Sequence, residues 1–96
     1  MPGYILSPQA QISLQQISQY TFKQHGAAQR NTYLKMLRYH IRRIADNPSH
    51  GRERNAIKAG YYSLVAGKHN IYYRLRDTHV EILDVLHQSM EPQLHL

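Results

Sequence analysis

Histidine is the side chain with the widest chemical range in this sequence, and seven histidines occur among 96 residues. Imidazole can bind a metal or transfer a proton near neutral pH. The histidines are His25, His40, His50, His69, His79, His87 and His95. No two of them stand four residues apart on an expected helix, and the sequence contains no cysteine. The spacing therefore predicts no metal site and no cofactor.

Carboxylates offer one residue of interest, Asp84, which interrupts an otherwise apolar segment. The other acids are few and fall mainly in expected turns, so no catalytic pair of carboxylates is predicted. An isolated buried charge is costly, so Asp84 must reach solvent or pair with a cation. Arg74, in the segment expected to be the neighbouring strand, is the predicted partner in a structural ion pair.

Tyrosine occurs as two doublets, Tyr61-Tyr62 and Tyr72-Tyr73, in segments expected to be adjacent strands. Because successive side chains of a strand point to opposite faces, one member of each doublet is expected in the core and one outside. The outward tyrosines, with Lys58, Arg74 and Arg76, would form a surface able to stack on bases or hold a peptide. Ordinary packing across strands is the simpler explanation.

The net charge of +6 is carried entirely by residues 1–45, which contain no acid. Within this half, Lys35, Arg38 and Arg42 are spaced to lie on one side of a helix. The excess indicates an anionic partner, which could be a nucleic acid, a membrane surface or an acidic protein segment. A solvated helix face is the alternative explanation.

Two amphipathic helices are expected to position these groups, at about residues 8–24 and 27–46. Ser7-Pro8 is typical of a helix start, Gly26 of a helix end, and Asn47-Pro48 stops the second helix. The apolar stripes are Ala10, Leu14, Ile17 and Thr21 in the first helix and Leu34, Leu37, Ile41 and Ile44 in the second. The short link between them predicts an antiparallel hairpin.

The expected strands are residues 3–6 at the start of the chain and residues 57–65, 69–75 and 79–86 after the hairpin. These segments are short and rich in Ile, Val and Tyr. Tight connections between the last three predict an antiparallel meander. The fold class is therefore α+β, with an N-terminal strand and an α-helical hairpin packed on a small curved antiparallel sheet.

The last of these strands has apolar side chains on both faces. Val80, Ile82 and Leu86 are expected on one face and Leu83 and Val85 on the other. A strand covered on both faces is typically central, so residues 79–86 are expected inside the sheet.

Length and composition narrow the class of protein further. A chain of 96 residues is expected to form one domain, residues 1–96, with a small core and function on a surface or shallow groove. The absence of cysteine argues against a disulfide-stabilised secreted scaffold. No signal peptide or membrane-spanning run is visible, so the expected location is cytoplasmic.

The sequence resembles the ParE branch of the RelE/ParE toxins of bacterial toxin–antitoxin systems over nearly its whole length. The first half carries the resemblance in Tyr4-Ile5-Leu6-Ser7-Pro8, Leu14, Ile17, Tyr20, Gly26-Ala27-Ala28-Gln29 and Asn47-Pro48. The second half carries it in Gly51-Arg52, Ile57, Gly60-Tyr61, His69, Ile71, Tyr73-Arg74, Val85-Leu86-His87, Ser89-Met90 and His95-Leu96. Each motif is unspecific alone, and their shared order and spacing carry the resemblance.

The resemblance implies a toxin that inhibits DNA gyrase and is neutralised by a cognate antitoxin, which wraps its C-terminal segment around the toxin. DNA would be bound only indirectly, through the antitoxin. Such tails are commonly acidic, which would suit the basic first half of the chain. The expected antitoxin-binding residues are Lys35, Arg38, Arg42, Tyr33 and Tyr20. The expected target-binding residues are Tyr61, Tyr62, Arg74, His87 and Met90.

Two positions depart from the family pattern, which often has arginine where this chain has Tyr62 and Asp84. Of three arginines expected on the sheet, only Arg74 remains. The departures put electrostatic contact with an anionic target through this face in question, and Asp84→Arg is expected to increase toxicity if sheet charge matters.

The alternative function on the same fold is a ribosome-dependent mRNA endonuclease of the RelE branch. That chemistry needs an acid, a base and cations beside the scissile phosphate. The candidates would be His87, Arg74, Lys58 and Arg52, with Tyr62 or Tyr73 stacking on the base. A nontoxic relic that still binds an antitoxin is the third alternative.

Overall fold

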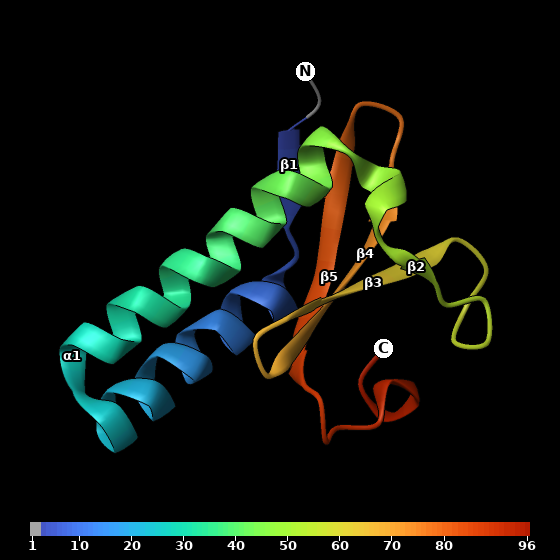
Figure 1. Ribbon diagram of the computed structural model, residues 1–96. Coiled ribbons are helices and arrows are strands. Elements are labelled where there is room, and N and C mark those ends of the chain that lie inside the picture. Colours follow the sequence, from blue (N-terminus) through green and yellow to red (C-terminus); the bar gives the residue numbers. More distant parts are fainter. Residues whose placement is uncertain (1–2) are drawn as a thin grey trace.

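The computed structural model describes residues 3–96, and the chain starts with a short strand that leads directly into a long helix (Figure 1). Strand β1 spans Gly3–Leu6 and helix α1 spans Pro8–Asp46. Ser7 caps the helix, since its side chain accepts a hydrogen bond from the backbone N–H of Ala10 and proline follows at the first helical position. The predicted helix start is confirmed.

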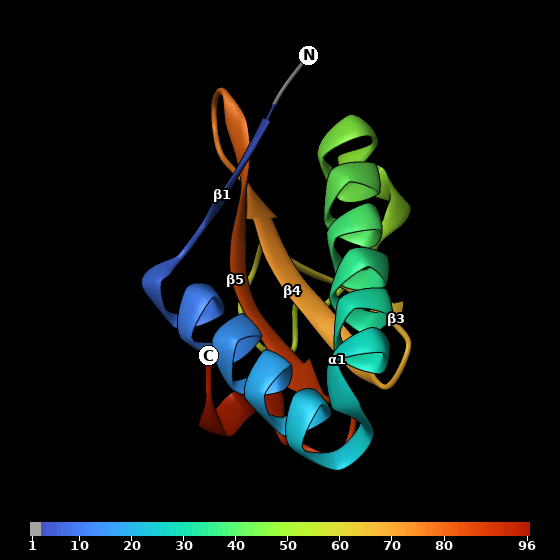
Figure 2. The ribbon, with the colours of Figure 1, turned by 90° about the vertical axis from the view of Figure 1, so that its left-hand side faces the viewer.

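Helix α1 is bent back on itself at Gly26, which has φ 87° and ψ −180°. A side chain rarely adopts a positive φ of this size, so glycine lets the chain reverse here. The bend divides α1 into two antiparallel arms, which we call the first arm (residues 8–25) and the second arm (residues 27–46) (Figures 1 and 2). The predicted helical hairpin is confirmed. None of the helices in residues 3–96 is both long and apolar enough to span a bilayer.

The remaining elements build one five-stranded sheet of order β1-β5-β4-β3-β2. Its later strands are β2 (Arg52–Glu53), β3 (Tyr61–Ala66), β4 (His69–Leu75) and β5 (His79–His87). Short 3-10 turns at Pro48–His50 and Pro92–Leu94 precede β2 and follow β5. The predicted meander of β3, β4 and β5 is confirmed, whereas β1 joins β5 in parallel and the short β2 extends the other edge.

The first strand of the meander is shorter than predicted. Residues 57–60 form a turn in which the backbone N–H of Tyr61 donates to the carbonyl of Lys58 at 3.1 Å. The apolar and aromatic run starting at Ile57 suggested a strand, but Gly60, with φ 88°, lets the chain turn before β3 starts.

The core lies between the two arms and one face of the sheet (Figure 2). It contains Ala10 and Ile17 from the first arm, Leu37, Ile41 and Ile44 from the second arm, and Ala66, Ile71, Tyr73, Val80, Ile82 and Val85 from the sheet. The predicted stripes are therefore largely correct. The exceptions are Leu14 and Leu34, which are only partly buried; beside Leu14, Ser13 takes the buried place one residue earlier.

Strand β5 contains an irregularity that changes which side chains face the helices. The pairing with β4 shifts between Tyr72, opposite Asp84, and Tyr73, opposite Ile82, so Leu83 is an extra residue. An extra residue reverses the alternation beyond it. Val85 consequently joins Val80 and Ile82 in the core, and the predicted grouping of Leu86 with these two is wrong.

The tyrosine doublet of β4 also differs from the prediction, because both Tyr72 (1% exposed) and Tyr73 (0%) are buried. The hydroxyl of Tyr73 donates to the carbonyl of Pro48 at 2.6 Å and accepts from the N–H of Gly51 at 2.9 Å. Burial raises the pKa of Tyr73, so the phenol stays neutral. This side chain ties the connector after α1 to the sheet.

Candidate functional site

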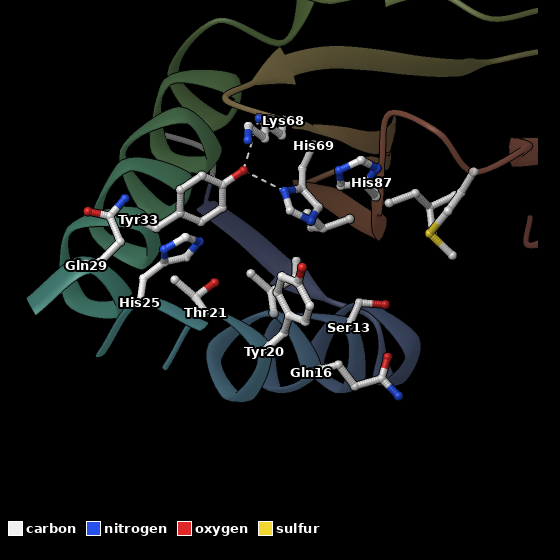
Figure 3. A pocket seen from close by; sticks show the side chains of 14 residues that line it. Ser13, Gln16, Tyr20, Thr21, His25, Gln29, Tyr33, Lys68, His69 and His87 are labelled. Carbon is white, nitrogen blue, oxygen red and sulfur yellow. Dashed lines mark hydrogen bonds between the residues drawn. The ribbon is translucent and has the colours of Figure 1, made fainter. Parts of the chain in front are cut away.

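A cleft of about 450 Å³ opens between the arms of α1 and the end of β5 (Figure 3). We call it the hairpin cleft; it is lined by Ser13, Gln16, Ile17, Tyr20, Thr21, His25, Gln29, Tyr33, Lys68, His69, Val85, Leu86, His87 and Met90. Its size lies in the ordinary range for ligand sites. Apolar side chains form much of its wall, and three imidazoles, two phenols, two aliphatic hydroxyls, two amides and one ammonium supply the polar groups.

Tyr33 fixes the orientation of His69 at one side of the hairpin cleft (Figure 3). The Tyr33 hydroxyl oxygen accepts a hydrogen bond from the backbone N–H of Lys68 at 3.0 Å and lies 2.5 Å from Nδ1 of His69. We assign the hydroxyl hydrogen to the bond with Nδ1, because the hydroxyl oxygen already accepts from Lys68. His69 therefore carries its own proton on Nε2.

The electrostatic environment of His69 agrees with this neutral form. Burial, together with the smaller effect of the neighbouring His87, lowers the pKa of His69 from 6.5 to about 4. The rings of His69 and His87 meet edge to face with centroids 5.3 Å apart. At neutral pH, His69 is thus an uncharged hydrogen-bond donor through Nε2–H.

His87 is oriented by the residues that follow β5. The backbone N–H of Ser89 donates to Nδ1 of His87 at 3.2 Å, and the Ser89 hydroxyl lies 2.8 Å from the same atom. In its neutral form His87 consequently also carries its proton on Nε2. Two imidazole N–H groups, from His69 and His87, are left without a protein acceptor in residues 3–96.

The turn between β3 and β4 shapes this side of the hairpin cleft, because Gly67 lets Tyr33 approach the backbone. Gly67 has φ 60°, and a Cβ placed there would lie 2.8 Å from Cε of Met36 and 2.9 Å from the Tyr33 hydroxyl. Only glycine accommodates both the backbone conformation and this close approach. The turn therefore helps to hold the Tyr33–His69 contact.

A second, more open depression of about 480 Å³ runs along the second arm. We call it the basic groove; it is lined by Arg30, Asn31, Leu34, Lys35, Arg38 and Arg42. Lys35, Arg38 and Arg42 are exposed, and within residues 3–96 none of them forms an ion pair. The predicted basic stripe is therefore a continuous cationic surface.

The structure separates the residues predicted to bind an antitoxin into two groups. Lys35, Arg38 and Arg42 line the basic groove, whereas Tyr20 and Tyr33 line the hairpin cleft. Both surfaces include residues of the second arm, since Gln29 lines the cleft and Arg30 the groove.

The residues predicted to bind a target are also divided. His87 and Met90 line the hairpin cleft, where they join Tyr20 and Tyr33. Tyr62 stacks on the buried Tyr73, with centroids 5.5 Å apart and planes inclined by 18°, and packs against the core.

Tyr61 and Arg74 lie opposite one another in the β3–β4 pairing, on the sheet face turned away from the arms. Arg74 binds Glu81 at 2.7 Å, so the predicted ion pair with Asp84 is wrong. Asp84 is 1% exposed and instead accepts hydrogen bonds from the hydroxyl of Ser13 and the N–H of Val85. Because position 84 is buried, Asp84 does not change the charge of the exposed sheet face.

The four residues proposed for nuclease chemistry do not converge. His87 lines the hairpin cleft, whereas Arg74, Lys58 and Arg52 do not. Lys58 lies over the ring of Tyr61 at 5.9 Å, and Arg52 is exposed on β2. Within residues 3–96, no cluster of three or more potential ligands is placed to hold a metal ion.

Sequence reasoning missed His25, Lys68 and His69 as members of one site. Only His69 had a visible signal, since it belongs to the motifs that carry the family resemblance. Their proximity depends on the bend at Gly26 and the turn at Gly67, which bring three distant segments together.

Comparison with solved structures identifies other proteins with this fold. The chain superposes on a structure titled "Chromosomal ParDE TA system from P. aeruginosa" with a TM-score of 0.79, over 91% of this chain and 96% of that one, at 13% identity. It also superposes on "The structure of YoeB dimer from Staphylococcus aureus" with a TM-score of 0.61, over 91% and 97% of the chains, at 20% identity. These likenesses define a RelE/ParE-like fold.

Sequence comparison identifies the branch. The family model described as "ParE toxin of type II toxin-antitoxin system, parDE" matches residues 4–92. The chain is 38% identical to "Toxin ParE1" of Mycobacterium tuberculosis (strain ATCC 25618 / H37Rv), over 97% of this chain and 96% of the relative. It is 36% identical to "Toxin ParE1" of Caulobacter vibrioides, over 100% and 99% of the two chains. The chain belongs to the ParE toxin family of type II toxin–antitoxin systems.

Proposed function

We propose that this ParE-family toxin inhibits DNA gyrase in the cytoplasm and is held inactive by a cognate antitoxin. Membership of the ParE family supports a toxin role. A structure of similar fold carries a title that names a toxin–antitoxin assembly, "Crystal structure of heterotetrameric complex of YoeB-YefM toxin-antitoxin from Staphylococcus aureus.". An antitoxin partner is the corresponding expectation for this chain, and DNA would be contacted only through that partner.

The basic groove is the proposed site for the acidic part of the antitoxin. Lys35, Arg38 and Arg42 are exposed and free of ion pairs within residues 3–96. A row of cations attracts an acidic segment over a distance of about one Debye length, which is ~8 Å at physiological salt. The segment would then reach Tyr20 and Tyr33 in the hairpin cleft, where apolar anchors can be buried.

The observation that favours a gyrase inhibitor over a nuclease is the separation of the candidate catalytic groups. A general acid or base must lie within hydrogen-bond reach of the proton it transfers, and phosphate charge must be neutralised beside it. His87 lies in the hairpin cleft, whereas Arg74 is bound to Glu81 on the opposite face of the sheet. Action by binding, without catalysis, fits this arrangement.

The direct test compares the two target systems with the same purified toxin. We expect the toxin to inhibit supercoiling by purified gyrase and to accumulate cleaved DNA–gyrase complexes, while messenger RNA on ribosomes stays intact. Cleavage of ribosome-bound RNA with normal supercoiling would overturn the proposal in favour of the RelE-type activity. The absence of both effects, together with tight antitoxin binding, would identify a nontoxic relic.

A further inference from the structure

The hairpin cleft contains hydrogen-bond donors that have no role in the proposed function. Nε2 of His69 and Nε2 of His87 each carry a proton, because their Nδ1 atoms accept hydrogen bonds from Tyr33 and Ser89. Neither Nε2 atom has a hydrogen-bond partner in residues 3–96. Lys68 also lines the hairpin cleft, is exposed, and forms no ion pair within residues 3–96.

The charged groups that line the hairpin cleft indicate which class of ligand it can bind. None of its 14 lining residues is acidic. Two acids adjoin lining residues along the chain. Asp84, next to Val85, is buried and already accepts hydrogen bonds from Ser13 and Val85, and Glu91, next to Met90, is exposed but does not line the cleft. A wall with donors and a cation but no carboxylate favours an anionic group.

The apolar part of the wall indicates what accompanies that anion. Ile17, Val85, Leu86 and Met90 line the hairpin cleft together with the 67% exposed ring of Tyr20. Such a surface can bury an aliphatic or aromatic side chain beside the anion. An N–H donor from each imidazole and one ammonium match the oxygens of a carboxylate, and the apolar wall matches the side chain beside it.

We propose that the hairpin cleft is a carboxylate-binding site for an acidic peptide, in which His69, His87 and Lys68 hold one carboxylate. An apolar side chain next to that carboxylate packs on Tyr20 and Met90. Tyr33 is a positioning residue, since it acts by fixing the ring of His69 (Figure 3). The identification of the peptide as the antitoxin's acidic segment rests on the proposed function.

The two surfaces together favour a peptide as the occupant. Lys35 and Arg38 line the basic groove, and the imidazole donors line the hairpin cleft. A peptide that carries several acidic side chains can use both surfaces. A small free anion can occupy only one of them.

The test uses a small probe and needs no antitoxin. N-acetyl-phenylalaninate offers a carboxylate next to an aromatic ring, and N-acetyl-phenylalaninamide is the matched neutral probe. Each is titrated into the isotopically labelled toxin while the Nε2 signals of His69 and His87 are followed by NMR. We expect saturable binding of the carboxylate and binding of the amide weaker by about tenfold, as for loss of a hydrogen bond to a charged group.

Matched variants separate a specific site from a general charge effect. His87→Gln places an N–H donor near the position of Nε2, whereas His87→Asn places it near Nδ1. We expect the first to keep most of the affinity and the second to lose about tenfold. Lys68→Ala is expected to weaken the carboxylate probe, and Arg76→Ala, which removes an exposed cation outside the cleft, to leave it unchanged.

Several results would overturn the carboxylate site. Equal affinity for the two probes, no saturable binding, or the same loss in His87→Gln and His87→Asn would each do so. Tighter binding of inorganic phosphate than of the carboxylate would instead show a phosphate site. Gyrase inhibition and antitoxin binding are measured in separate experiments. If the probes do not bind as expected, the proposed function still stands. If gyrase is not inhibited, the probe result still stands.

Discussion

The hydroxyl of Ser13 donates a hydrogen bond of 2.5 Å to the carboxylate of Asp84, joining the first arm of α1 to strand β5 across 71 positions of sequence. Nearby, Ser7 binds the same strand twice, from its N–H to the carbonyl of Ile82 at 3.0 Å and from its hydroxyl to the carbonyl of Leu83 at 2.7 Å. These bonds give the backbone carbonyls of Ile82 and Leu83 on β5 a hydrogen-bond donor at the point where β1 ends. We call these hydrogen bonds of Ser7 and Ser13 to β5 the polar seam. The polar seam, together with apolar packing, holds the first arm on the sheet.

Removal of the Ser13 hydroxyl is expected to destabilise the fold. Within residues 3–96, Ser13→Ala leaves the buried Asp84 carboxylate with the N–H of Val85 as its one donor. The expected loss in the free energy of unfolding is about 1–3 kcal/mol, the cost of an unsatisfied buried polar group. Urea unfolding measures it, with Ser18→Ala on the same arm as the control. Equal stability of the two variants would show that the seam contributes nothing.

Loss of the Tyr73 hydroxyl is expected to loosen the connector after α1. Tyr73→Phe removes the only side-chain bonds from the sheet to the carbonyl of Pro48 and the N–H of Gly51 within residues 3–96. The expected cost is about 1–3 kcal/mol, with faster amide exchange at Gly51. Tyr61→Phe, at a partly exposed position of β3, is the control. Unchanged exchange at Gly51 in Tyr73→Phe would contradict the proposed tie.

The neutral state of His69 predicts how stability depends on pH. Its folded-state pKa of about 4 lies below the unfolded value of 6.5, so between these values the unfolded chain binds a proton that the folded chain does not. The free energy of unfolding should therefore fall as pH falls from 6.5 to about 4, and this contribution should be constant above 6.5. After allowance for partial exposure, the loss is about 2 kcal/mol.

Denaturant unfolding at several pH values isolates this contribution. The other six histidines are present in both the wild type and His69→Gln, so their contribution cancels when the two unfolding free energies are subtracted. As the pH falls from 6.5 to about 4, we expect the wild type to lose more unfolding free energy than His69→Gln. Parallel pH curves for the two proteins would show that His69 is not held neutral by the fold.

The basic groove predicts the kinetics of antitoxin capture. In a triple variant, Lys35→Ala, Arg38→Ala and Arg42→Ala, the association rate constant at low salt should fall by about tenfold or more, with a smaller change in dissociation. The difference from wild type should shrink as salt rises, because screening removes the attraction. Stopped-flow measurement with the product of the adjacent reading frame provides both rate constants.

The control for this variant removes the same charge from scattered exposed positions. Lys23→Ala, Arg52→Ala and Arg76→Ala together preserve the basic groove and are expected to retain near wild-type association. An equal slowing in both triple variants would assign the effect to net charge alone.

The hairpin was predictable because its signals are local. Helical periodicity, the Ser7-Pro8 start and Gly26 act within a few residues of one another, so the sequence predicts both arms nearly to their ends. The register of β5 was not predictable, because the extra residue at Leu83 is visible only in the pairing with β4. That one residue moved Val85 to the core.

The candidate site was predicted in pieces. Tyr20, Tyr33, His87 and Met90 were identified as binding residues, but the sequence assigned them to two different partners. The structure places all four in one cleft and adds Lys68 and His69 from the β3–β4 turn. No spacing rule links these segments, since their approach depends on how the arms pack on the sheet.

The sequence by itself determined the family, the α+β hairpin-and-sheet class, and the location of the net charge on α1, because motif order, periodicity and composition are properties of the chain alone. Only the tertiary structure decided the partner of Asp84, the tautomers of His69 and His87, and the existence of the hairpin cleft. Each of these depends on contacts between residues far apart in sequence, and such contacts form only when the two arms close on the sheet.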